Sequence, residues 1–334
     1  MKVLGIESSC DETAVAIVES GSKVLGSHVF SQIERHKIFG GVIPEIAARE
    51  HLEVLDKMVV AALAEAELGI SDIDAIAVTQ GPGLIGALLV GASYAKGLAL
   101  SSKKPLIPVN HVHAHVHGAL LGVEGVNFPC LSLVVSGGHT HIYFMESHAK
   151  FEKLAHTLDD ACGECFDKVA KLFGLGYPGG PIVEKLAKQG DPQKVSMPKM
   201  MEDKSRLLFS YSGLKTYMVN LRHREKDVSD HRLADILAGF QDEALGQLSR
   251  KMKAALEVRP EAKSVLVAGG VAANQRFRDL LGDLVKVPLH FPRLEYCSDN
   301  AAMIAALGYH NWESSGDKNV FGQLGWDCFS RYPY

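Results

Sequence analysis

Four histidines occupy every second position of one short segment, which reads N-H-V-H-A-H-V-H-G over residues 110–118. In a strand all four imidazoles would share one face, whereas a helix groups residues four positions apart. An apolar run with two prolines at 104–109 precedes Asn110, a good helix N-cap, and Ala and Leu residues follow before Gly122. The pattern therefore predicts a strand, a cap and a helix, with the histidines on two helical faces.

On such a helix His111 and His115 form one pair, and His113 and His117 form another. Two imidazoles one turn apart are a common half of a metal site, and the nearby helix N-terminus favours an anionic ligand beside the metal. Asp299, just before an apolar helical segment near the C-terminus, is a natural third ligand for His111 and His115. A solvated histidine cluster, or one held in the core, is the alternative interpretation.

Two stretches repeat a strand, small-residue turn, strand pattern, and two others repeat a strand, glycine turn, helix pattern. The first pair has its turns at 7–13 (E-S-S-C-D-E-T) and 136–140 (S-G-G-H-T), and the second pair covers 74–91 and 264–284. The chain is therefore predicted to be a duplicated α/β unit, with an insertion in the second half within 150–260. Turns of this kind, facing each other across a cleft, would bind a nucleotide phosphate chain from both sides.

Composition limits the class of protein. The 334 residues, 47% of them hydrophobic, suffice for one large or two medium domains, and a net charge of −4 leaves no overall basic surface for nucleic acid. Local basic charge at 185–206 and 222–226 is the best candidate for phosphate-backbone contact. Six scattered cysteines indicate reduced thiols in the cytoplasm, and no run of eighteen apolar residues predicts a membrane span.

Two further patterns admit a purely structural explanation. Gly81, Gly83 and Gly86 match G-x-G-x-x-G, but the acidic residue expected about twenty positions later is missing, so close packing of strand on helix is the better interpretation. The segment 44–67 predicts a long amphipathic helix. Its apolar stripe (Leu52, Leu55, Val59 and Leu63) fits a core or a partner helix equally well.

Nine motifs taken together resemble the bacterial TsaD family, the transferase subunit of the tRNA threonylcarbamoyladenosine system. They are C-D-E-T, G-P-G-L-I-G-A-L-L-V-G, N-H-V-H-A-H, V-S-G-G-H-T, G-E-C-F-D-K, Y-P-G-G-P, F-S-Y-S-G-L-K-T, A-G-G-V-A-A-N and C-S-D-N-A-A-M. The resemblance covers nearly the whole chain, in order. It implies an actin-like, Hsp70-like and sugar-kinase-like fold, with domains at 1–120 and 121–334 around a nucleotide cleft.

The resemblance also implies site residues. The metal ligands would be His111, His115 and Asp299, and the ion Fe²⁺, with Zn²⁺ as the alternative. Contacts to an adenine nucleotide (threonylcarbamoyl-AMP, with ATP or ADP also considered) carry over to Val134, Val135, Ser136, Gly137, Gly138, Asp167, Gly180 and Asn274. The chain departs from the family at Cys162 and Cys165, at His113, where Glu is frequent, and at Glu184, where some relatives have Asp.

The activity so implied is transfer of the threonylcarbamoyl group from threonylcarbamoyl-AMP to the exocyclic amine of the adenosine beside the anticodon, in tRNAs that read codons beginning with A. Because that amine is a poor nucleophile, catalysis requires charge neutralisation on the AMP leaving group and removal of a proton. Asp11 and Glu12 are the candidates for removing the proton or positioning the amine, with turn capping as their alternative role. Expected partners are tRNA, a TsaB-like paralogous subunit, a TsaE-like ATPase and a TsaC-like synthase.

Three other functions fit the sequence less well. A metallopeptidase needs H-E-x-x-H, but the residues between His111 and His115 are V-H-A, so the base is missing. A small-molecule kinase on the same fold, or a non-catalytic nucleotide-binding scaffold, would have no use for the histidine and aspartate ligands. The metal triad therefore favours the transferase.

Overall fold

The computed structural model describes residues 1–203 and 205–331 and divides the chain into two compact units. Unit 1 contains Met1–Glu124, the short segment His148–Lys150, and the chain from Pro292 onward. Unit 2 contains Gly125–Ser147 and Phe151–Phe291. The first boundary lies close to the sequence-based division at residue 120. The C-terminal segment instead groups with unit 1, because its helix packs on the first strand of that unit.

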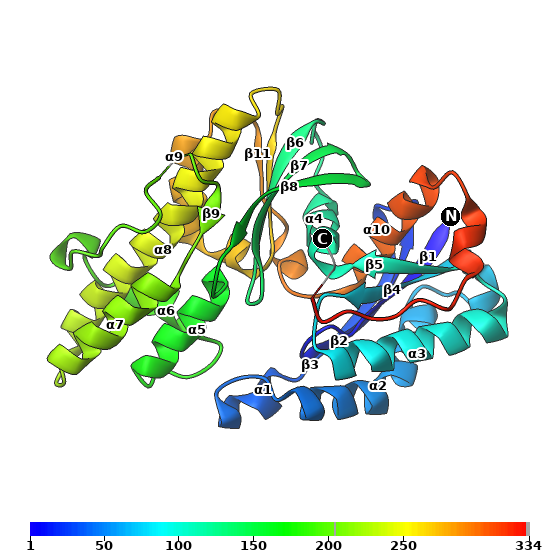
Figure 1. Ribbon diagram of the computed structural model, residues 1–334. Coiled ribbons are helices and arrows are strands. Elements are labelled where there is room, and N and C mark those ends of the chain that lie inside the picture. Colours follow the sequence, from blue (N-terminus) through cyan, green and yellow to red (C-terminus); the bar gives the residue numbers. More distant parts are fainter. Residues whose placement is uncertain (204, 332–334) are drawn as a thin grey trace. The chain divides into compact units, whose positions relative to one another are not determined.

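Unit 1 is built on a five-stranded sheet of order β3-β2-β1-β4-β5 (Figure 1). β1 pairs antiparallel with β2, which pairs antiparallel with β3, whereas β4 is parallel to both β1 and β5. The strands are β1 (Lys2–Glu7), β2 (Glu12–Glu19), β3 (Lys23–Ser31), β4 (Ala75–Gly81) and β5 (Leu106–Asn110). Continuous apolar runs in the central strands allow both faces of the sheet to be buried.

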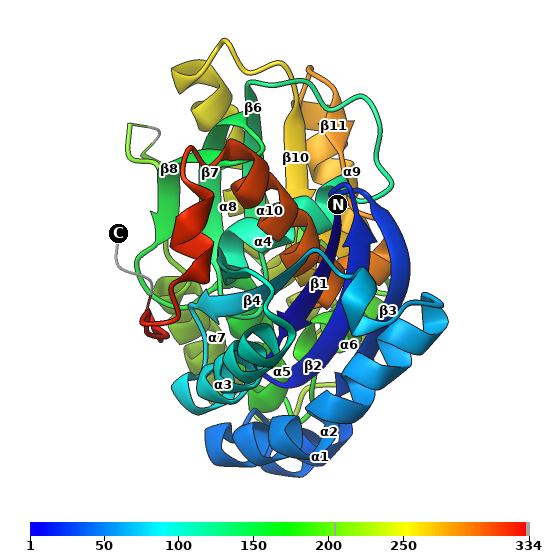
Figure 2. The same ribbon diagram turned by 90° about the vertical axis from the view of Figure 1, so that its right-hand side faces the viewer.

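Helices cover both faces of this sheet because its strands alternate between two apolar sets. Leu4 and Ile6 pack with residues of α2 (Pro44–Glu65) and α3 (Ile85–Ser102), which lie side by side in Figure 2. On the other face α10 (Ala301–Ser314) crosses β1, where a Cβ on Gly5 would lie 2.4 Å from the Ala301 carbonyl oxygen. The remaining helical elements are α1 (Ile33–His36), η1 (Lys37–Phe39), η2 (Ile70–Asp72), α4 (His111–Leu120), η5 (Leu294–Tyr296) and η6 (Lys318–Gly322).

Unit 2 repeats this plan with a six-stranded sheet of order β11-β10-β6-β7-β8-β9. The order β8-β7-β6-β10-β11 corresponds, strand for strand, to β3-β2-β1-β4-β5, which confirms the predicted duplication. The strands are β6 (Cys130–Val135), β7 (Thr140–Ser147), β8 (Lys150–Thr157), β9 (Leu208–Phe209), β10 (Val265–Ala268) and β11 (Leu289–His290).

The predicted insertion is the helical layer between β8 and β10. In unit 1 the equivalent strands β3 and β4 are separated by α1, η1, α2 and η2, of which α2 alone is a long helix. The layer contains α5 (Cys162–Leu172), α6 (Gly179–Ala187), η3 (Pro192–Lys194), α7 (Ser212–Arg224) and the 29-residue α8 (Asp230–Val258); η4 (Gly270–Ala273) and α9 (Gln275–Leu284) follow β10. Much of α8 is buried in the core of unit 2, together with Cys162 and Cys165.

The three glycines at 81, 83 and 86 extend from the end of β4 to the first turn of α3. A Cβ on Gly81 would lie 2.2 Å from the Phe329 carbonyl oxygen, and one on Gly83 would lie 2.6 Å from that of Ser9. Two of the three positions therefore serve close backbone packing, as the sequence indicated. Among the described helices, α3 alone is long and apolar enough to cross a membrane on length and composition. Lys96 interrupts it, and the Lys96 ammonium lies 4.3 Å from the Trp326 ring centroid.

Candidate metal centre and substrate loops

The histidine segment forms the strand, cap and helix that its sequence predicts. Asn110 ends β5, and its side-chain oxygen accepts hydrogen bonds from the backbone N–H groups of Val112 and His113 at the start of α4. This cap fixes the first turn, so His111 and His115, one turn apart, face the same side. The rings of His111 and His115 lie with their centroids 4.7 Å apart, and both side chains are buried.

Asp299 lies within reach of both imidazoles. Its Oδ1 atom is 3.3 Å from Nε2 of His115 and 3.7 Å from Nε2 of His111. Asn300 follows as the N-cap of α10, accepting from the Met303 N–H and donating to the Ser298 carbonyl, which holds the loop in place. The structure thus brings together the three residues that the sequence proposed as ligands, all within unit 1.

The chemistry of these side chains fits a divalent cation. Burial, together with the neighbouring His111 charge, lowers the pKa of His115 to about 3, so its imidazole is neutral and able to coordinate. Within the described part of the chain, neither ring nitrogen of His115 has a hydrogen-bond partner. A buried donor set of two imidazoles and one carboxylate, with a nitrogen left to coordinate, suits Fe(II) or Zn(II).

Glu7, at the end of β1, contacts the ring nitrogen of His111 that faces away from Asp299. Its Oε2 atom lies 3.0 Å from Nδ1 of His111 and accepts from the Thr79 hydroxyl, while Oε1 accepts from the Ser9 N–H. Burial would raise the pKa of Glu7, but His111 and these hydrogen bonds lower it to about 2. A carboxylate on the far nitrogen of a ligand histidine orients the ring and increases its basicity. The sequence showed only a glutamate at a strand end, and this role was missed.

Asp11 and Glu12 follow in the turn between β1 and β2. Asp11 is buried, and Glu12 accepts a hydrogen bond from the Ser31 hydroxyl across the β2–β3 pair. Burial and then the charges of Asp299 and Asp11 raise the pKa of Glu12 to about 10. Burial raises the pKa of Asp299 to about 6, with contributions from Glu7 and Asp11. These carboxyl groups therefore form one acidic cluster with the candidate metal ligands, and a cation would relieve their repulsion.

In unit 2 the turn between β6 and β7 presents two exposed glycines. The Ser136 N–H donates to the His139 carbonyl and the Ser136 hydroxyl accepts from the His139 N–H, which closes the turn. Nothing lies within 4 Å of a Cβ built on Gly137 or Gly138, so there is room for a ligand. Val134 and Val135 are fully buried in β6, so they position this turn and present no surface of their own.

The remaining predicted contacts of unit 2 lie in α5 and at the N-terminal ends of α6 and α9. Asp167 in α5 accepts a hydrogen bond from the Gly179 N–H at the start of α6, where a Cβ on Gly180 would meet open space. Asn274 caps α9 by accepting from the Phe277 N–H and donates to the side chain of Gln241. Glu184 reaches the same helix end, accepting from the N–H of the next residue, Gln275. The structure therefore brings α5, α6 and α9 together and gives Asn274 a structural role.

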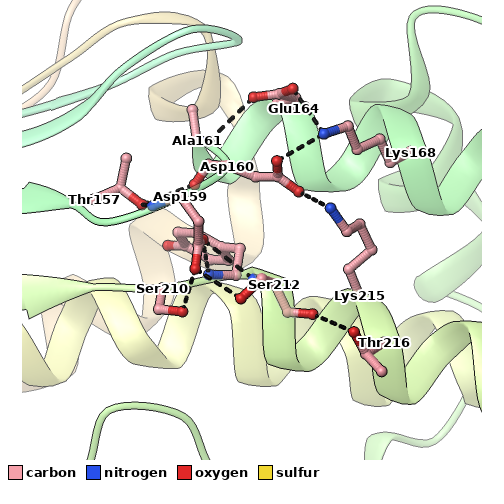
Figure 3. Close-up of polar contacts among 11 residues, drawn as sticks. Thr157, Asp159, Asp160, Ala161, Glu164, Lys168, Ser210, Ser212, Lys215 and Thr216 are labelled. Atoms are coloured by element: carbon pink, nitrogen blue, oxygen red, sulfur yellow. Dashed lines mark hydrogen bonds and ion pairs between the residues drawn. The ribbon is translucent and has the colours of Figure 1, made fainter.

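The acidic residues before and in α5 are bound internally (Figure 3). The Asp159 carboxylate accepts from the backbone N–H groups and hydroxyls at the start of α7, including the Tyr211 N–H at 2.7 Å and the Ser212 hydroxyl at 2.7 Å. Asp160 pairs with Lys168 at 2.7 Å and with Lys215. Asp159 and Asp160 thus connect the end of β8 to α5 and α7, and their role is to stabilise the fold.

The fold of both units is that of the actin-like ATPases and sugar kinases. The 2-hydroxyglutaryl-CoA dehydratase component A of Acidaminococcus fermentans matches with a TM-score of 0.55 at 16% identity, covering 94% of this chain and all of that one. A ROK hexokinase from Thermus thermophilus matches with a TM-score of 0.54 at 15% identity and the same coverage. At such identities the likeness concerns the fold alone.

Sequence comparison identifies the family. The family model of TsaD, tRNA N6-adenosine threonylcarbamoyltransferase, matches residues 23–306. A tRNA N6-adenosine threonylcarbamoyltransferase of Moorella thermoacetica is 48% identical over 93% of this chain and 92% of its own length. Another, from Clostridium beijerinckii, is 47% identical over 95% of both chains. This chain belongs to the TsaD family, as its motifs indicated.

Proposed function

We propose that this chain transfers the threonylcarbamoyl group from threonylcarbamoyl-AMP to the N6 amine of the adenosine beside the tRNA anticodon, and releases AMP. Family membership over most of the chain supports the reaction. The observation that carries the site is the approach of His111, His115 and Asp299, whose ligand atoms all lie within 4.8 Å of one another.

His111, His115 and Asp299 would hold one divalent metal, for which we favour Fe²⁺ over Zn²⁺. When bound, such an ion supplies Lewis-acid stabilisation of charge on phosphate and acyl oxygens. The chain's own contribution is to present neutral His115 and to hold His111 through Glu7. Three protein ligands leave coordination positions open for a substrate.

Glu12 is our candidate for proton removal from the attacking amine, with Asp11 positioning it. The high pKa of Glu12 reflects burial first and then the charge of Asp299. Neutralising Asp299 with a cation removes that contribution and lowers the pKa of Glu12 toward the range in which a carboxylate accepts a proton at neutral pH. The carboxylate would thus become basic only when the site is loaded.

We further propose that unit 2 binds the adenylate. Backbone N–H groups in the exposed turn at Gly137 and Gly138 can donate to phosphate oxygens, and the open space above Gly180 admits a flat or polar group. Ser136 adds a hydroxyl to this turn. ATP or ADP would use the same loop.

A TsaB-like paralogous subunit is the partner we propose for α2 and α3. These helices leave an apolar groove of about 380 Å³ between them, lined by Leu52, Leu55, Leu89, Val90, Ser93 and Tyr94. Leu52 is 72% exposed and Leu89 is 50% exposed, whereas Leu55 is in the core. The stripe of α2 therefore serves both core and surface, and its exposed part fits a partner helix.

Other partners follow from the reaction itself. A TsaC-like synthase in the cytoplasm would supply the adenylate, and a TsaE-like ATPase would assist turnover. For tRNA, the C-terminal end of α7 offers the exposed Arg224 and the neighbouring Lys226 as phosphate contacts.

The proposal is tested by reconstitution. The chain, its expected partner proteins, ATP, threonine, bicarbonate and unmodified tRNA are combined, and the modified nucleoside is measured after digestion of the tRNA. We expect product with the wild-type chain and a loss of 100-fold or more for His111→Ala. His231→Ala, at an 81% exposed side chain, is the control and should be fully active. Wild-type transfer by His111→Ala would overturn the metal assignment.

A further inference from the structure

A second group of three histidines lies in unit 1, apart from the ligands already described. His117 is near the end of α4, His148 is in the tight turn between β7 and β8, and His310 is in the last part of α10. One nitrogen from each ring lies within 4.8 Å of the others. Three separate segments of the chain therefore converge on one point, with only imidazoles as donors.

The rings already pack against one another. The centroids of His148 and His310 are 4.0 Å apart with an interplanar angle of 3°, and His117 lies 5.2 Å from His310 and 5.8 Å from His148. All three imidazoles are at least half-buried, and burial lowers the pKa of His310 to about 4, so the rings are neutral.

His117 is held in a position suited to coordination. Its Nδ1 atom lies 3.4 Å from the His113 carbonyl oxygen, one turn earlier in α4, which assigns the hydrogen to Nδ1. Nε2 is then the nitrogen that carries a lone pair. A backbone carbonyl in this role is a common support for a histidine ligand.

We propose that His117, His148 and His310 form a second metal site, selective for a late first-row divalent ion such as Zn²⁺. Nitrogen-only donors favour Zn²⁺, Ni²⁺ or Cu²⁺ over Mg²⁺ or Ca²⁺, which prefer oxygen. Tetrahedral coordination with Zn–N distances of about 2.0–2.1 Å requires the ligand nitrogens to lie roughly 3.3 Å from one another. The stacked rings of His148 and His310 would therefore have to turn toward the ion. His148 is in a turn between two strands, where the backbone is less constrained than in a helix. A water molecule would complete the tetrahedron.

This inference does not depend on the proposed activity, and its test measures metal content. The tag-free full chain is equilibrated with Zn²⁺, passed through a desalting column and analysed for zinc and protein. The wild-type chain should retain two equivalents. His148→Ala and Asp299→Ala should each retain one, and the double variant none. His231→Ala is the control, because it removes a solvent-exposed histidine elsewhere, and should retain two.

Two results would overturn the proposal. One is a wild-type chain that retains a single equivalent, lost in Asp299→Ala; the other is a His148→Ala chain that still retains two. His148 is the position of choice because a turn residue can be replaced with little effect on folding, and circular dichroism of each variant verifies this. Co²⁺ in the Asp299→Ala chain gives an independent signal: tetrahedral visible absorption that disappears in the double variant. If only the site at His111, His115 and Asp299 is lost, the Co²⁺ absorption remains. The experiment therefore tests the two metal sites independently.

Discussion

The Glu7 carboxylate lies 3.0 Å from Nδ1 of His111, on the side of the ring away from Asp299. A glutamate in β1 thus sets the direction in which a histidine of α4 presents its other nitrogen. Ser9 assists, since its hydroxyl lies 3.1 Å from the same Nδ1 atom. The first ligand of the proposed metal is therefore held by a strand that contains no ligand itself.

Replacing Glu7 with Gln should weaken metal binding about 10–100-fold, the usual effect of losing a carboxylate that supports a ligand histidine. The isosteric amide keeps the packing but removes the charge that raises the basicity of His111. The dissociation constant can be measured by competition with a chromophoric chelator. Glu19→Gln, at the far end of the β2 hairpin, is the control and should bind as wild type. Unchanged affinity in Glu7→Gln would show that His111 does not depend on this contact.

Metal affinity should rise with pH. Burial alone would lower the pKa of His111, but Glu7 and Asp299 raise it to about 9 in the metal-free chain. The ion must displace this proton, so between about pH 6 and 8 each pH unit should strengthen binding roughly tenfold. Below pH 6 protonation of Asp299 should make the dependence steeper. Calorimetry in buffers of different ionisation enthalpy counts the released proton; a pH-independent constant would contradict the protonation of His111.

Glu12→Gln should reduce kcat about 10²–10⁴-fold with little change in KM, as expected for loss of a general base. Asp11→Asn, which alters only the neighbour of Glu12, should cost less. Single-turnover transfer to tRNA separates chemistry from product release. Glu34→Gln is a surface control, since the exposed Glu34 side chain forms an ion pair with Lys37, three residues further along the chain. Equal loss of kcat and metal content in Glu12→Gln would instead mark a structural role in the acidic cluster.

Asp159→Ala should destabilise the chain by about 1–3 kcal/mol, because it leaves the N–H groups of Tyr211 and Ser212 without their acceptor. The exposed position of Asp159 favours the lower part of this range. Hydrogen bonds lower the pKa of Asp159 despite partial burial, so the contribution is present above about pH 4 and is lost as pH falls further. Urea unfolding measures it. Asp203→Ala removes side-chain hydrogen bonds to nearby Ser205 at an exposed position and should leave the free energy of unfolding nearly unchanged.

Leu89→Asp should weaken binding of the paralogous subunit by roughly 30-fold or more, since it places a charge in the apolar groove between α2 and α3. Leu100→Asp is the matched control: it is on the same helix and 72% exposed but outside the groove. Analytical ultracentrifugation of the mixed subunits measures the effect. If both variants bind equally well, the partner uses another surface.

Sequence periodicity sufficed for the elements that alternate regularly. The turn predicted at 136–140 directly follows β6, α9 ends at the predicted residue Leu284, and Asn110 caps α4 as expected. The long α8 was missed because it is buried on most of its faces, which removes the one-sided apolar pattern that a surface helix shows. The pairing of His113 with His117 correctly separated two faces of α4, but the true neighbours of His117 are His148 and His310. Isolated histidines in a turn and in an apolar helix have no local pattern that reveals such a contact.

The return of the C-terminal segment to unit 1 has a consequence for synthesis of the protein. Asp299 and α10 leave the ribosome only after residues 125–291 have been made, which at about 5–20 residues per second takes roughly 8–30 s. During that interval β1 lacks the helix that covers Gly5, and the two imidazoles of α4 lack their carboxylate. A nascent chain therefore cannot complete the proposed metal site early, and premature termination yields a fragment with an uncovered sheet, a natural substrate for chaperones and proteases.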